Sequence, residues 1–230
     1  MSELYPLLLL PEFYERVWGT RDLSLMYPHK AARQGGFEKP IGEVWLTGDE
    51  CRVSNGPLAG QKLADVTKRF GRELLGDAAS DASRFPLLLK MIFPKEKLSV
   101  QVHPDDEAAR AKGQSCGKTE CWYVLAAEPG AQVAIGFKGD VSREQAEKAI
   151  AENHLEEMLN WVNVRPGEMI YVAAGTVHAI GPGVILVETQ QNSDTTYRLY
   201  DYGRGRELHI SEGLAAMKPH PPMGKVPRRE

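Results

Sequence analysis

The stretch Leu98–His103, which reads LSVQVH, decides the fold of this chain. Apolar and polar residues alternate along it, as they do in a β-strand with one buried face. Gln101 and His103 are two residues apart, so their side chains point into the same space, and both are potential metal ligands. Pro104 and the acidic run 105–107 follow at once, and the acidic run is predicted to begin a short helix. The stretch therefore predicts one wall of a metal site inside a β-barrel.

Short strands and turns dominate the chain on both sides of this stretch. The alternation of apolar residues predicts strands at 43–47, 85–93, 161–164, 169–173, 184–190 and 195–202, and helices at 62–75 and 142–160. Segments 119–127 and 131–137 are joined by Glu128-Pro129-Gly130, a turn signal that predicts a hairpin. Many short strands with few helices are typical of a barrel or jelly roll. We expect a single domain over 1–217 with a loop-rich lead-in, and an extended, basic, proline-rich tail over 218–230.

Composition restricts the partners and the compartment of the protein. The 230 residues carry a formal net charge of −3, which argues against a nucleic-acid-binding protein. Cys51, Cys116 and Cys121 are widely spaced and odd in number, which indicates free thiols in a reducing compartment. The apolar run 7–10 is too short to span a membrane and lacks a basic flank. We expect a cytoplasmic protein without membrane or nucleic-acid partners, and the sequence leaves its oligomeric state open.

Two further residues join the opening strand as metal-ligand candidates. A lone histidine on a strand is more often structural than a ligand, but His103 has three companions. Gln101 shares its face, Glu120 begins a strand on the same side as Trp122, and His178 follows a tight turn. Two histidines, a glutamate and an amide form a plausible set of ligands for Zn²⁺ or Fe²⁺.

Four motifs in the same order resemble a known family. GEMIYVAAGTVH, residues 167–178, is similar to the second signature of the cupin superfamily, with Ala173 in place of the usual proline. In the first signature, Gln101 stands where most cupins carry a histidine. QVHPDDE, GKTECWYVL, AAGTVHAIG and ETQQNSDTTYRLYDYGR together resemble the type I phosphomannose isomerases, over roughly residues 85–209. The resemblance implies a mainly β fold, a cupin-type barrel or jelly roll with a few flanking helices.

The resemblance also implies a chemistry and a set of site residues. It implies that the enzyme interconverts mannose 6-phosphate and fructose 6-phosphate, with a phosphorylated hexose as the substrate. It implies one zinc ion per chain, with ligands at Gln101, His103, Glu120 and His178. It further implies a catalytic arginine at Arg198, active-site residues at Lys90, Lys118 and Glu188, and a substrate-phosphate position at Ser99.

General chemistry agrees with these roles but leaves the base open. Aldose–ketose isomerisation moves a proton between C1 and C2, so it needs an electrophile at the oxygen and a base. Glu188, Lys90 and a metal-bound hydroxide are all candidates for that base. From the pattern alone, Glu188 could lie on a half-exposed strand and Lys118 could be a solvated loop charge. Arg198 could simply pair with Asp194 or Asp201.

Two other functions remain open at this point. The same scaffold could carry a different metal cupin, such as an oxygenase or another sugar isomerase, or a non-catalytic sugar-binding protein. Many members of the family also continue past the segment that matches residues 206–217 into a further β-rich region. That region bears on substrate enclosure and on oligomer contacts.

Overall fold

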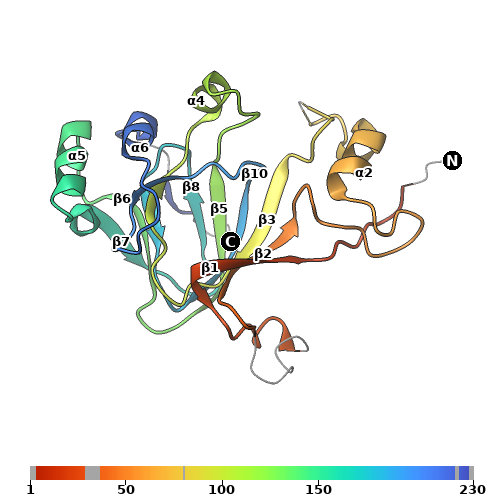
Figure 1. The fold of residues 1–230 in the computed structure, drawn as a ribbon, viewed down its shortest axis with the longest axis horizontal. Helices are drawn as coiled ribbons and strands as arrows, with labels where there is room; N and C mark the ends of the chain where they lie inside the picture. The colour runs from red at the N-terminus through yellow and green to blue at the C-terminus, as the bar shows by residue number, and fades with distance from the viewer. Residues whose placement is uncertain (1–3, 29–36, 80, 221–222, 228–230) are drawn as a thin grey trace.

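A computed structural model describes residues 4–28, 37–79, 81–220 and 223–227, and in it the chain forms two antiparallel sheets that face each other (Figure 1). The larger sheet contains, in spatial order, β1 (Glu12–Thr20), β2 (Ile41–Thr47), β3 (Leu87–Ile92), β10 (Val184–Gln191), β5 (Glu120–Ala127), β8 (Met169–Val172) and β12 (Met223–Lys225). The smaller sheet contains β11 (Tyr197–Tyr200), β4 (Val100–Val102), β9 (His178–Ile180), β6 (Gln132–Phe137) and β7 (Leu159–Asn163). The predicted mainly β fold with few helices is confirmed.

Short helices flank the sheets rather than build the core. They are α2 (Leu63–Phe70), α3 (Arg72–Leu75), α4 (Asp106–Ala111), α5 (Arg143–Ala151) and α6 (Ile210–Ala216), with a 3-10 turn over Leu155–Met158. The helix predicted over 62–75 is broken at Gly71, whose φ of 48° lies outside the helical region. The helix predicted over 142–160 ends early, because Asn153 has a φ of 59°. The acidic start of α4 is confirmed, because Asp105 accepts a hydrogen bond from the Ala108 amide.

The interior between the sheets is apolar on one side and polar on the other. Strand β10 shows this best, because every second residue along it is buried. Val184 and Leu186 pack into the apolar core, and Glu188 and Gln190 continue the same face as polar groups. The register of the sheet sets Glu188 opposite Lys90 on β3 and opposite Trp122 on β5. The alternation along β10 therefore places buried polar side chains directly beside the apolar core.

The predicted hairpin of segments 119–127 and 131–137 is wrong. Strand β5 lies between β10 and β8 in the larger sheet, whereas β6 lies between β9 and β7 in the smaller one. The turn at Glu128-Pro129-Gly130 takes the chain across from one sheet to the other. Trp122 and Val124 of β5 then pack against the same core as Val133 and Ile135 of β6. Facing sheets bury both apolar faces against each other, which a flat hairpin would not do.

Both ends of the chain contribute more strand than expected. The lead-in contains β1, a nine-residue edge strand that pairs with β2. Its sequence, EFYERVWGT, does not alternate strictly, so periodicity does not mark it. The expected tail contributes the three-residue strand β12, which pairs with β8. No helix in the described part of the chain is long and apolar enough to cross a membrane.

Candidate active site

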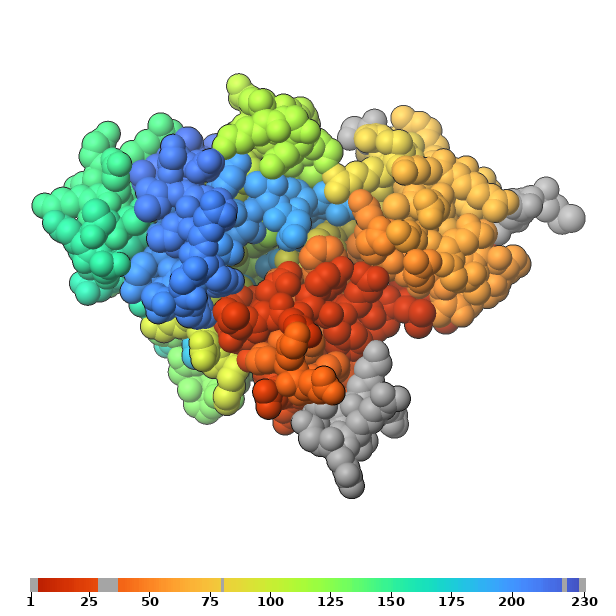
Figure 2. All heavy atoms as spheres, in the orientation of Figure 1, coloured from red at the N-terminus to blue at the C-terminus, as the bar shows by residue number. Residues whose placement is uncertain are grey.

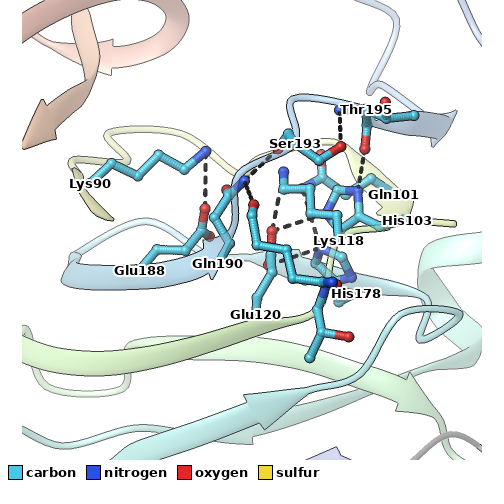
Figure 3. A network of polar contacts seen from close by, with 12 residues as sticks. Lys90, Gln101, His103, Lys118, Glu120, His178, Glu188, Gln190, Ser193 and Thr195 are labelled. Atoms are coloured by element: carbon cyan, nitrogen blue, oxygen red, sulfur yellow. Dashed lines mark hydrogen bonds and ion pairs between the residues drawn. The ribbon is translucent and has the colours of Figure 1, made fainter. Parts of the chain in front are cut away.

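The four candidate metal ligands come together in the polar half of the interior (Figure 3). One ligand atom from each of His103, Glu120 and His178 can be chosen so that all three lie within 4.8 Å of one another. His103 Nε2 is 3.1 Å from Glu120 Oε1, and His178 Nε2 is 3.8 Å from Glu120 Oε2. The amide nitrogen of Gln101 lies 3.2 Å from His178 Nε2. We call these four residues the metal cluster.

Strand geometry places each member of the metal cluster. Val100 and Val102 are buried against the helical side of the smaller sheet, so Gln101 between them points the other way, toward the larger sheet. In the ladder, Gln101 pairs with His178 on β9. Glu120 is the first residue of β5 and reaches the same point from the opposite sheet. Residues far apart in sequence therefore meet only because the two sheets face each other.

Backbone carbonyls fix the orientation of both imidazole rings. His103 Nδ1 lies 2.9 Å from the Thr195 carbonyl oxygen, and His178 Nδ1 lies 2.9 Å from the Thr176 carbonyl oxygen. A ring that donates Nδ1–H to a carbonyl keeps Nε2 as a lone pair for a ligand. Burial, aided by the charge of Lys118, lowers the pKa of His103 to about 3, and burial also lowers the pKa of His178. Both rings are therefore neutral, as metal binding requires.

Two acceptor atoms that face each other indicate that this cluster suits a cation. His103 Nε2 and Glu120 Oε1 are buried and lie 3.1 Å apart, but a neutral ring that donates through Nδ1 and an ionised carboxylate are both acceptors there, so no hydrogen bond joins them. Glu120 Oε1 also pairs with the Lys118 ammonium at 3.1 Å. Burial raises the pKa of Glu120, but the charges of Lys118 and the histidines outweigh it and hold that pKa well below its ordinary value. Two imidazole nitrogens, a carboxylate and an amide are a donor set that Zn²⁺ accepts.

A second group of charged residues crosses the larger sheet beside the metal cluster. We call Arg16, Glu43, Lys90 and Glu188, from β1, β2, β3 and β10 in that order, the charged row. Arg16 Nε donates to Glu43 Oε1 at 2.8 Å, and the Trp45 indole donates to Glu43 Oε2 at 2.8 Å. Lys90 Nζ lies 3.6 Å from Glu43 Oε2 and 3.0 Å from Glu188 Oε1. Each charge in the row therefore has a neighbour of opposite sign.

Burial and pairing set the protonation states along the charged row. Burial raises the pKa of Glu43, but the charges of Lys90 and Arg16 outweigh it and bring that pKa to about 2. Burial lowers the pKa of Lys90, but Glu188 and Glu43 outweigh it, so its pKa lies above the ordinary value and the ammonium persists. Burial and the charge of Glu120 raise the pKa of Glu188 above its ordinary value, despite Lys90. Of the two carboxylates in the row, Glu188 therefore takes up a proton more readily than Glu43.

A cavity of about 330 Å³ opens beside both groups. In the described chain it is lined by Arg16, Trp18, Glu43, Lys90, Ile92, Leu98, Ser99, Gln101, Lys118, Glu188, Asp194, Thr196, Arg198 and Arg206. Figure 2 shows a recess between the segment that contains β1 (red) and the segment after β11 (blue). A larger hollow of about 590 Å³ lies elsewhere, at Lys97 and Trp161, and its lining includes no member of the metal cluster.

Burial and contacts decide between the alternatives that the sequence left open for Glu188, Lys118 and Arg198. Glu188 and Lys118 are buried, so neither is a surface or solvated loop charge. Lys118 Nζ lies 3.1 Å from Glu120 Oε1, which places it against the metal cluster. Arg198 forms no ion pair with Asp194 or Asp201, and its Nη1 donates to the Glu207 carbonyl oxygen at 2.7 Å. Its buried Nε has no partner in the described part of the chain.

The structure brings together every residue that the sequence suggested for the site, and adds others. Ser99 lines the cavity, with its hydroxyl 3.3 Å from the Gln101 side-chain oxygen, and its role toward phosphate stays a prediction. Arg16, Glu43 and Arg206 line the same cavity and were not suggested. A signal for the first two existed in the sequence, since each precedes a tryptophan by two residues on a strand.

Comparisons with known proteins agree with this geometry. Residues 7–158 match the sequence model of the phosphomannose isomerase type I catalytic domain. The mannose-6-phosphate isomerase ManA of Bacillus subtilis is 38% identical over 227 residues, which cover 93% of this chain and 68% of that protein.

Two solved structures share the fold of this chain. The crystal structure of the mannose 6-phosphate isomerase from Bacillus subtilis superposes with a TM-score of 0.84 at 34% identity, covering 94% of this chain and 69% of that one. A zinc-bound mannose 6-phosphate isomerase superposes with a TM-score of 0.69 at 18% identity, covering 94% of this chain and 75% of the other. At that identity the second match speaks for the fold alone.

Proposed function

The chain belongs to the type I phosphomannose isomerase family, and from this premise we propose how it interconverts mannose 6-phosphate and fructose 6-phosphate. The reaction is an aldose–ketose isomerisation, in which a proton moves between C1 and C2 of the sugar. Three tasks follow: polarising the substrate oxygen, moving the proton, and stabilising the negative charge that develops. The metal cluster, the charged row and the cavity arginines supply groups suited to these tasks.

The metal cluster is proposed to hold one zinc ion. Gln101, His103, Glu120 and His178 would be its ligands, and two buried acceptor atoms, His103 Nε2 and Glu120 Oε1, that face each other without a hydrogen bond support this. A bound zinc ion would polarise the carbonyl or hydroxyl oxygen of the sugar and acidify the adjacent C–H bond. Lys118 lies against Glu120, where its ammonium balances the buried carboxylate and holds it in place.

Glu188 is proposed to carry the proton. Its carboxylate lies at the wall of the cavity, and burial raises its pKa, which makes it a stronger base than an exposed glutamate. Lys90 is the weaker candidate, because Glu188 and Glu43 keep its pKa high and its amine protonated. As a cation beside Glu188, Lys90 orients the carboxylate and offsets the charge that develops on the sugar.

Arg198 is proposed to stabilise the enediolate. Its guanidinium lies at the cavity with an unpartnered buried Nε, and arginine keeps its charge throughout the reaction. We expect Arg198→Ala to retain its metal and to lose turnover by about 10²- to 10³-fold in kcat. Metal content by elemental analysis and kcat in a coupled isomerase assay measure the two effects separately. Loss of the metal together with activity would contradict this role.

The single observation that carries the proposal is that a cavity lined by Gln101, Glu188 and Arg198 lies next to the neutral His–Glu–His cluster to which Gln101 belongs. An assay on mannose 6-phosphate under nitrogen tests it. Chelation should abolish activity and zinc should restore it without oxygen. A requirement for oxygen would instead point to an oxygenase on the same scaffold. Binding of the sugar phosphate without turnover would point to a non-catalytic sugar-binding protein.

A further inference from the structure

The orientation of the Arg206 guanidinium at the cavity wall is fixed by Asp201. Arg206 Nε donates to Asp201 Oδ2 at 2.9 Å, and Arg206 Nη2 bonds Asp201 Oδ1. This two-point fork occupies two of the three guanidinium nitrogens. Among the described residues, none accepts a hydrogen bond from Nη1. Arg206 therefore presents a free donor from a side chain that is held in one orientation.

Asp201 is itself held firmly in place. Its residue is only 4% exposed, and Arg204 Nη2 donates to its Oδ1 at 2.9 Å. Arg204 also donates to the Asp201 carbonyl oxygen at 3.1 Å and to the Lys97 carbonyl oxygen at 2.9 Å. Burial raises the pKa of Asp201, but Arg206 and Arg204 outweigh it and lower it, so the carboxylate stays ionised. Arg204 anchors the loop, and Arg206 faces the cavity.

Strand register sets this pair beside Ser99. Tyr200, the last residue of β11, pairs with Val100, the first residue of β4, so Asp201 and Ser99 leave the antiparallel ladder at the same end. Ser99, Arg198 and Arg206 all line the same cavity. A hydroxyl and two guanidinium groups therefore line one cavity, and Gln101 in the same lining belongs to the metal cluster.

The charges of the lining match a phosphate dianion. Within the described residues, five cationic side chains and three carboxylates line the cavity, which leaves a surplus of two positive charges. A phosphate monoester carries about −1.5 to −2 at neutral pH. Lys90 and Lys118 lie against buried carboxylates, and all three nitrogens of Arg16 already donate to Glu43 and the Glu15 carbonyl oxygen. Arg206 and Arg198 each keep a free donor, and of the two Arg206 is the one held by a carboxylate.

We propose that Arg206, aligned by the Asp201 carboxylate, binds the phosphate group of the sugar phosphate, with Ser99 and Arg198 beside it. The inference rests on the proposed function and extends it to the anionic end of the substrate. A guanidinium pre-oriented by a buried carboxylate loses little freedom on binding, and its planar donors suit phosphate oxygens. Asp201 is a positioning residue, since it acts through Arg206.

Arg206→Gln and Arg204→Gln form a matched pair that tests this inference. Both arginines bond Asp201, but Arg204 lies outside the set of described residues that line the cavity. In Arg206→Gln, the KM for mannose 6-phosphate and the inhibition constant of inorganic phosphate should each rise about 10- to 100-fold, with kcat changed by less than about threefold. In Arg204→Gln, Tm should fall, and both constants should rise clearly less than in Arg206→Gln, because the fork between Arg206 and Asp201 remains. Arg206→Lys keeps the positive charge but loses the two-point hydrogen bond to Asp201. Its KM and its inhibition constant should therefore lie between those of wild type and those of Arg206→Gln.

Asp201→Asn separates positioning from simple charge. It removes the carboxylate and leaves both arginines, so the KM should rise although the cavity gains positive charge. Unchanged KM and phosphate constants in Arg206→Gln would overturn the inference, as would equal weakening in Arg204→Gln. If the zinc-loaded wild type does not isomerise mannose 6-phosphate, the proposed function fails. Calorimetry with inorganic phosphate on wild type and Arg206→Gln still tests the phosphate site by itself.

Discussion

The metal cluster and the charged row lie beside the same cavity but are built in opposite ways. The metal cluster joins both sheets, and its imidazoles are held by the carbonyls of Thr195 and Thr176. The charged row runs across the neighbouring strands β1, β2, β3 and β10 of the larger sheet, and its members hold one another through opposite charges. The histidines of the metal cluster are neutral, whereas positive and negative side chains alternate along the charged row.

This difference separates what each group is able to do. Neutral, oriented imidazoles leave lone pairs for a cation; backbone carbonyls orient the rings and burial keeps them neutral. A row of buried ions fixes one another's protonation, and removing any member leaves an uncompensated charge. Damage to the metal cluster should therefore appear as lost metal. Damage to the charged row should appear as lost catalysis or lost stability with the metal retained.

The largest expected effect comes from the metal cluster. His178→Ala removes one ligand, so zinc affinity should fall by at least about 100-fold and isomerase activity should fall to background. Chelator competition measures the affinity, and the coupled assay measures the activity. His154→Ala is the control, because His154 is partly exposed and stands outside the cluster. Full activity of His178→Ala in metal-free buffer would show that activity does not depend on the metal cluster.

Next in size is the loss of the proposed base in the charged row. Glu188→Gln keeps the shape of the side chain but removes the proton acceptor, so kcat should fall by about 10²- to 10⁴-fold. Zinc content should stay at the wild-type level, which distinguishes this variant from His178→Ala. Glu147→Gln, an exposed change on α5, should leave both quantities unaltered. Loss of zinc from Glu188→Gln would mean that the two groups are not separate.

The smallest expected effect is on stability and its dependence on pH. Glu43→Gln leaves Lys90 and Arg16 without their shared carboxylate, so the free energy of unfolding should fall by about 2 kcal/mol at neutral pH. The folded pKa of Glu43, about 2, lies below its ordinary value of 4.5. Its contribution is therefore fully present above pH 4.5 and is lost as the pH falls toward 2.

Urea unfolding at a series of pH values measures this contribution. The gap in stability between wild type and Glu43→Gln should narrow as the pH falls through that window. Glu15→Gln breaks an exposed pair with Lys39 and should change the free energy of unfolding by less than about 1 kcal/mol. A gap that stays constant with pH would show that Glu43 does not act through its charge.

The sequence predicts that the four residues of the metal cluster meet, because each of them lies in a short local motif, and their role as ligands stays a prediction. Gln101 and His103 share one strand, and Glu120 and His178 each begin another strand. Of the charged row, only Lys90 and Glu188 were predicted from the sequence. Arg16 and Glu43 join the row through strand order and register. Those depend on pairing between distant segments, which periodicity does not report.

The same limit explains the errors in the fold. Segments 119–127 and 131–137 are correctly predicted as strands, yet their pairing is wrong, because a turn signal does not say which sheet the next strand enters. Strand β1 was missed because its residues do not alternate strictly. The position of Arg206 at the cavity follows from its fork with Asp201, a contact between side chains that no sequence spacing reveals.

Titration of the metal-free protein with zinc tests the central claim most directly, with isomerase activity on mannose 6-phosphate measured at each step. The account predicts that activity starts at background, rises in proportion to added zinc and levels off at one ion per chain. Full activity in the presence of excess chelator, or zinc binding at the metal cluster without any turnover, would contradict it.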